Sequence, residues 1–106
     1  MVVRWTAHAD KSTEKIFLFY EQKSERVARK IVSEIRASAE LLTAFPQISS
    51  VERFLSDRPE TFRSLVVVRG LFKIIYFVNE ITKEIVIVTV WDCRQNPQNL
   101  KNEIKI

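Results

Sequence analysis

Two apolar segments around a short polar turn, residues 71–78 and 84–91, constrain the fold of this chain more than any other feature. Both are rich in β-branched and aromatic residues, so the sequence predicts a β-hairpin with a loop of about five residues. Side chains alternate across a sheet. One face of the first strand therefore carries Phe72, Ile74, Tyr76 and Val78, and the other carries Leu71, Lys73, Ile75 and Phe77. Because both faces are apolar, both need a covering layer.

Length and composition indicate one globular domain over residues 1–106. Hydrophobic residues make up 46% of the chain, which argues against disorder, yet no apolar run is long enough to cross a bilayer. The N-terminus lacks the basic and apolar regions of a signal peptide, so a cytoplasmic location is expected. The single cysteine, Cys93, excludes an internal disulfide. The net charge of +4 suits either an anionic partner or simple solubility.

The first half of the chain predicts a short strand followed by two helices. After a strand over residues 2–5, Thr6 is positioned to cap a helix over residues 7–22. Ser24 is positioned to cap a second helix over residues 25–44, which ends before Pro46. This second helix has an apolar stripe at three- and four-residue spacing. The stripe consists of Ala28, Ile31, Ile35, Ala39 and Leu42.

The second half predicts the sheet. Residues 51–55 suit either a short strand or a helical turn, residues 62–68 a strand, and Gly70 the reversal into the hairpin. The expected fold is α+β, with an N-terminal strand, a helical hairpin and three further strands of an antiparallel sheet. One helical hairpin covers only one face of such a sheet. We therefore expect the other face to be a binding surface.

Four short motifs carry a family resemblance that extends over nearly the whole chain. A Leu-Leu pair precedes Phe-Pro in residues 40–46, and an Arg-x-Leu motif occupies residues 63–65. Aromatic and basic residues then open the strand 72–78, and an Arg-x-x-Pro motif closes residues 90–97. In this order and spacing they resemble the RelE/ParE superfamily of bacterial type II toxins, also called plasmid stabilisation system proteins. The resemblance implies a toxin that blocks growth until a cognate antitoxin binds it.

The resemblance leaves three functions open. A ParE-like toxin would act on a protein target such as DNA gyrase, whereas a RelE-like toxin would cut mRNA on the ribosome. An inactive relative would only bind its partner. The family often has Tyr-Arg where this chain has Phe72-Lys73, and His where it has Asp92. The ribonuclease branch commonly carries a Tyr or His near the position of Leu100, and none follows Tyr76 here. That absence favours the first and third functions.

Nuclease chemistry without a metal needs cations for the phosphate as well as a proton-transfer pair. Arg63, Lys73 and Arg94 would be the catalytic cations if strand pairing brought them together. No acid or base is evident, since Asp92 would repel phosphate, so whether the protein is an enzyme is left open. His8, Cys93 and the scattered carboxylates show no metal-ligand spacing, and there is no glycine-rich phosphate loop, so neither a metal nor a cofactor is expected.

The uncovered sheet face is the expected antitoxin site, and it would also allow a homodimer. Its apolar strand residues would bind the antitoxin while basic residues orient it. The expected antitoxin-binding residues are Leu65, Lys73, Ile75, Phe77 and Arg94. The alternative is that residues 47–60 or the C-terminal tail fold back over this face.

Overall fold

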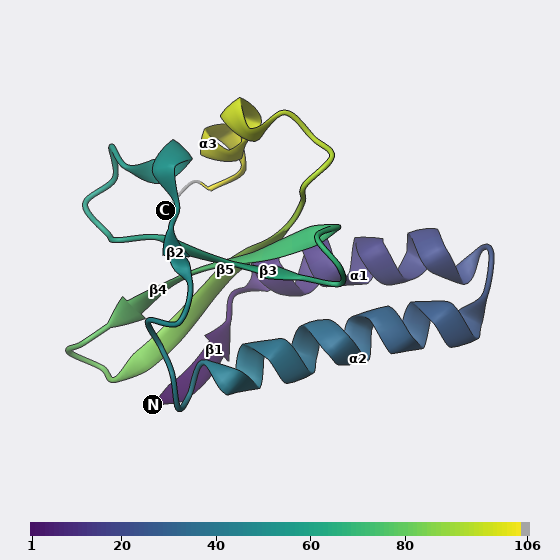
Figure 1. Ribbon diagram of the computed structural model, residues 1–106, viewed down its shortest axis with the longest axis horizontal. Helices are drawn as coiled ribbons and strands as arrows, with labels where there is room; N and C mark the ends of the chain where they lie inside the picture. Colours follow the sequence, from purple (N-terminus) through teal and green to yellow (C-terminus); the bar gives the residue numbers. More distant parts are fainter. Residues whose placement is uncertain (105–106) are drawn as a thin grey trace.

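Residues 1–104 of the computed structural model are described, and residues 105–106 of the expected domain lie outside them. A helical hairpin lies on one side of a five-stranded sheet, and short helical turns lie on the other (Figure 1). In chain order the elements are β1 (Val2–Trp5), α1 (Ala7–Glu21), α2 (Glu25–Leu41), β2 (Ser50–Val51), the 3-10 helix η1 (Arg53–Leu55), β3 (Arg63–Val67), β4 (Phe72–Asn79), β5 (Glu84–Asp92), the 3-10 helix η2 (Pro97–Asn99) and α3 (Leu100–Glu103).

The two helices begin at the expected caps. Thr6 Oγ1 accepts a hydrogen bond from Ala9 N at 3.1 Å, and Ser24 Oγ accepts one from Val27 N at 3.2 Å. Each bond satisfies a backbone N–H that has no partner within the first helical turn. All five residues of the predicted stripe on α2 are buried. Residues 51–55 contain both expected structures, a strand pair and a 3-10 turn.

The sheet has the order β1-β5-β4-β3-β2, and this confirms the α+β fold with one correction. β1 runs parallel to β5, so the sheet is mixed and not wholly antiparallel. The sequence did not predict this parallel pair, because only a short turn between two strands imposes an antiparallel direction. The connection from β1 to its neighbour β5 passes through both helices and three strands, which leaves either direction open.

The first face of the sheet packs on the helices. Phe72, Ile74 and Tyr76 are all buried there, as the alternation predicts. A bulge in β5 between the partners of Ile75 and Tyr76 shifts the register by one residue. As a result, Ile87 and Val90 both face the helices although they are three residues apart.

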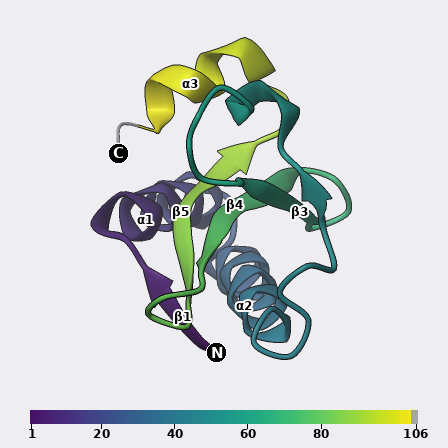
Figure 2. The same cartoon turned by 90° about the vertical axis from the view of Figure 1, so that its left-hand side faces the viewer.

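The second face is covered by the chain itself, so the expectation of an open face is wrong over most of its area. Ile75 is 0% exposed in a core that includes Leu55 from η1 and Leu100 and Ile104 from the C-terminal segment. Figure 2 shows α3 and the adjacent turns on the side of the sheet opposite α1 and α2. Around Ile75, this cover also occupies part of the surface that was expected to allow a homodimer.

A polar clamp holds this cover in place. Arg58 donates two hydrogen bonds to backbone carbonyls of the C-terminal segment, at 2.7 Å to Lys101 O and 2.8 Å to Ile104 O. These bonds satisfy carbonyls at the end of a short helix that could not stand alone. Both segments named in the alternative reading, residues 47–60 and the C-terminal tail, therefore contribute to the cover.

Candidate functional site

Two of the three candidate cations of a nuclease site, Arg63 and Lys73, are kept apart by the sheet. Arg63 pairs with Tyr76 in the sheet register, and Tyr76 faces the helices. Lys73 pairs with Trp91, which belongs to the core on the other face. Cross-strand partners point to the same side, so Arg63 and Lys73 lie on opposite faces of the sheet. The condition for a shared phosphate site is not met.

Lys73 is neutralised by its own chain. Its ammonium group forms an ion pair with Glu52, and the two side chains are only 15% and 4% exposed. The second carboxylate oxygen of Glu52 accepts a hydrogen bond from Phe54 N at 3.0 Å, which ends β2 and starts η1. A buried carboxylate without a cation is costly. Lys73 therefore fixes the loop that covers the second face.

Arg63 also has a structural role. Its Nη1 donates to Ser49 O at 2.9 Å, and the adjacent Tyr76 hydroxyl donates to Pro46 O at 2.9 Å. Tyr76 also contacts the Ser49 hydroxyl. Together these bonds anchor the chain that leaves α2 onto the first face of the sheet.

Arg94 forms a bidentate pair with Asp92 at the end of β5, with nitrogen–oxygen distances of 2.9 and 2.8 Å. Hydrogen bonding from Arg94 lowers the pKa of Asp92, and the same contact, with a smaller contribution from Tyr20, raises the pKa of Arg94. Asp92 is therefore a poor general base near neutral pH. Burial raises the pKa of the neighbouring Cys93 thiol, so this cysteine is a poor nucleophile.

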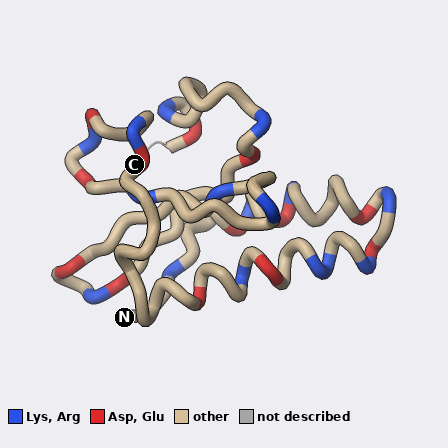
Figure 3. The backbone as a smooth tube through the Cα atoms, viewed as in Figure 1, with Lys and Arg blue, Asp and Glu red and all other residues tan. Residues whose placement is uncertain are grey.

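A cavity of about 400 Å³ lies beside Arg94, between α1 and the end of β5. Lys15, Tyr20 and Arg94 line it, but so do the carboxylates of Asp92 and Glu103. The two negative charges offset the two positive ones, which disfavours a phosphate. Along the backbone, the Lys and Arg positions are spread over helices, strands and loops (Figure 3).

The expected antitoxin-binding residues also divide between the faces. Leu65 packs beside the helix-side core, whereas Lys73, Ile75 and Phe77 lie on the second face. Ile75 has no surface to offer in this conformation. Phe77 is half-buried and lines a larger cavity, and the Arg94 side chain is 56% exposed.

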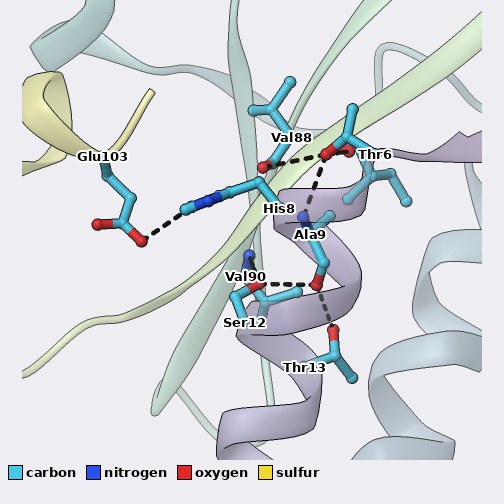
Figure 4. Close-up of polar contacts among 9 residues, drawn as sticks. Thr6, His8, Ala9, Ser12, Thr13, Val88, Val90 and Glu103 are labelled. Carbon is cyan, nitrogen blue, oxygen red and sulfur yellow. Dashed lines mark hydrogen bonds and ion pairs between the residues drawn. The ribbon is translucent and has the colours of Figure 1, made fainter. Parts of the chain in front are cut away.

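This larger cavity, of about 550 Å³, opens between β1, β5 and α3. Its walls are mainly apolar, and the basic side chains of Arg4 and His8 and the acidic side chain of Glu103 also line it. The lining residues are Arg4, Thr6, His8, Phe77, Val86, Val88, Asn102, Glu103 and Ile104. His8 Nε2 and Glu103 Oε1 are 2.9 Å apart and connect α1 to α3 (Figure 4).

The start of α1 is tied to β5 where β1 ends. Thr6 Oγ1 donates to Ile87 O at 3.0 Å, and Val90 N donates to Ser12 Oγ at 3.0 Å (Figure 4). The sequence did not predict this cavity, because its residues come from both ends of the chain and from the hairpin between them. The alternation of Val86 and Val88 was the only signal, and it did not identify β1 as their neighbour.

Within residues 1–104, no group of three His, Cys, Asp or Glu side chains is arranged to hold a metal ion. In the same range, no helix is long and apolar enough to cross a membrane.

Fold and sequence together define a toxin of a bacterial type II toxin–antitoxin system. The family model described as "ParE toxin of type II toxin-antitoxin system, parDE" matches residues 3–97, and the chain belongs to this family. A solved structure of the chromosomal ParDE toxin–antitoxin system from P. aeruginosa has the same fold, with a TM-score of 0.71. It is 24% identical, and the match covers 87% of this chain and 95% of that one. No curated protein matches the chain.

Proposed function

We propose that this toxin arrests growth in the cytoplasm by binding DNA gyrase, and that it does not cut RNA. The observation that carries this proposal is that Arg63 and Lys73 lie on opposite faces of the sheet. Arg63, Lys73 and Arg94 are each held by a partner from their own chain: Ser49 O, Glu52 and Asp92 respectively. Catalysis of phosphoryl transfer needs preorganised charge directed at one phosphate.

The proton-transfer groups support the same conclusion. Tyr76 is 0% exposed and engaged with Pro46 O, and His8 pairs with Glu103 on the other side of β5 from the helix-side core. Tyr76 lies beside Arg63, but its hydroxyl donates its proton to Pro46 O inside the core. A protein–protein mechanism needs no such groups.

We further propose that the cognate antitoxin contacts Phe77, which lines the larger cavity, and Arg94, whose side chain is 56% exposed. Contact with Ile75 would require the C-terminal segment to move, because Leu100 and Ile104 share its core. An antitoxin that does displace this segment would gain the apolar area that Leu100 and Ile104 now cover.

Induction of the toxin alone in a bacterial host tests the proposal. We expect growth arrest together with a DNA-damage response, intact mRNA, and recovery when the neighbouring open reading frame is co-expressed. Ribosome-dependent cuts in mRNA would overturn the proposed target. Unchanged growth with soluble, folded protein would leave an inactive relative.

A further inference from the structure

β1 presents an unpaired edge to solvent. Its ladder to β5 uses alternate residues, since Val2 N donates to Lys83 O at 3.2 Å and Thr6 N donates to Ile87 O at 3.1 Å. In a parallel ladder the intervening residues, Val3 and Trp5, direct their N–H and C=O groups away from the partner strand. In the described sheet, β1 is the terminal strand and pairs with β5 alone.

This edge is protected only by its short length and by Arg4. Edge strands are also commonly blocked by proline or a bulge, and β1, with the sequence Val-Val-Arg-Trp, has neither. Val2 is 67% exposed, and Val3 and Trp5 are only partly buried. A second chain could therefore pair with Val3 and Trp5 without rearranging the sheet.

The larger cavity lies beside this edge, on the second face of the sheet. Arg4 and Thr6 of the β1 segment line it together with Val86 and Val88 of β5 and Phe77 of β4. A strand added beside β1 would place alternate side chains on this face. One next to Thr6 would enter the apolar cavity, and one opposite Arg4 would meet a guanidinium group that is about half exposed. The Nε atom of this group pairs with Glu84 at 3.3 Å, so an acidic residue on the added strand would share Arg4 with Glu84.

The charges select the occupant. Arg4 lies on the cavity side of the edge, and Arg36 stacks on Trp5 on the other side, 4.1 Å from the ring centroid. A second copy of this chain, paired antiparallel through Val3 and Trp5, would set Arg4 against Arg4 of its partner. Directly opposed like charges destabilise a strand pair. An acidic residue at that position would stabilise it.

We propose that an extended segment of the cognate antitoxin adds to β1 as a sixth strand. The segment is acidic opposite Arg4 and apolar where it faces the cavity. This inference rests on the proposed antitoxin partnership. It places part of the antitoxin contact on the β1 edge, where Phe77 is the one residue shared with the expected binding set.

The opposite edge of the sheet supplies a matched control. Cys93 N donates to Leu71 O, so the odd-numbered backbone groups at the start of β4 bond to β5 and the even-numbered ones bond to β3. Val66 lies opposite the odd-numbered Lys73, so its backbone N–H and C=O point away from β4. β2 pairs only with Arg63 and Ser64, which leaves Val66 at a free edge, 60% exposed, with neither cavity reaching it. Proline is tolerated where a strand's N–H faces solvent. Val3→Pro and Val66→Pro each remove one outward N–H.

The product of the neighbouring open reading frame is the probe, titrated into full-length wild-type and variant toxin by calorimetry. We expect Val3→Pro to weaken binding at least about tenfold, because a main-chain hydrogen bond and the strand register are lost. Val66→Pro should bind like wild type. Circular dichroism and the urea midpoint check that both variants fold, and Arg4→Glu, which keeps every backbone donor, should also weaken binding.

The outcomes separate this inference from the proposed function. If the neighbouring product neither binds nor restores growth, both fail. If it binds Val3→Pro and Arg4→Glu as tightly as wild type, only the β1 edge is wrong. If Val66→Pro alone weakens binding, the strand adds to β3. If the free toxin is a dimer in solution and Val3→Pro makes it monomeric, the β1 edge binds a second copy of the toxin, and the antitoxin assignment is overturned.

Discussion

Removal of the Lys73 ammonium should strongly lower the free energy of unfolding. Lys73→Met keeps the length of the side chain but leaves the Glu52 carboxylate, which is 4% exposed, without its cation. Breaking one partner of a buried pair costs about 3–5 kcal/mol, against a total of about 5–15 kcal/mol for a typical domain. The Glu52→Gln change should cost less, because Lys73 is more exposed and reaches water.

The double variant, Lys73→Met with Glu52→Gln, isolates the pair. No charge is then left buried, so we expect it to be more stable than Lys73→Met alone, with a coupling of about 2–3 kcal/mol. Urea denaturation followed by fluorescence of Trp5 and Trp91 gives the free energy of unfolding for each variant.

An exposed ion pair provides the comparison. Lys83 and Glu80 are 3.6 Å apart and 70% and 64% exposed, so Lys83→Met should change stability by no more than about 0.5 kcal/mol. Lys73→Met at a cost below about 1 kcal/mol, with an additive double variant, would refute the buried pair. Lys73 would then be free to act on a partner or a phosphate.

Three further predictions concern the ends of the hairpin strands. Arg94 lowers the pKa of Asp92, so the ionised Asp92 stabilises the fold above the unfolded pKa of 3.8, and this stabilisation is lost as the pH falls through the folded pKa. The free energies of unfolding of wild type and Asp92→Asn, measured in urea, should therefore differ by under about 1 kcal/mol at pH 7 and become equal in acid. Burial raises the Cys93 pKa, so a disulfide reagent should modify it more slowly than free cysteine at pH 7.5, and equal rates would contradict this. Gly70 has φ +88°, so Gly70→Ala should lower the free energy of unfolding by about 1 kcal/mol although nothing lies within 4 Å of the added Cβ; unchanged stability would argue against this turn.

The sequence was sufficient for features that depend on neighbouring residues. The stripe on α2 was predicted in full because helical periodicity repeats within one element, and both caps follow from a single hydroxyl and the next turn. The helix-facing side of β4 was predicted by alternation alone.

Features that depend on distant residues were missed. Leu100 and Ile104 cover Ile75, but they lie in a short polar segment that shows no periodicity. The Glu52 partner of Lys73 is 21 residues away, in a region where strand and helix were equally plausible. Arg63 and Lys73 were considered together as one cationic site because the register between β3 and β4, which decides the face that Arg63 occupies, cannot be read from the sequence.

Purified DNA gyrase gives the most direct test of the proposed activity. Gyrase, ATP and relaxed plasmid are mixed with increasing amounts of the purified toxin, and the same preparation is added to translating ribosomes with a defined mRNA. We predict loss of supercoiling with increasing toxin, relief by the antitoxin, and intact mRNA. Unimpaired supercoiling together with cuts in ribosome-bound mRNA would contradict the proposal and would require a phosphate site that Arg63 and Lys73, on opposite faces of the sheet, do not form together.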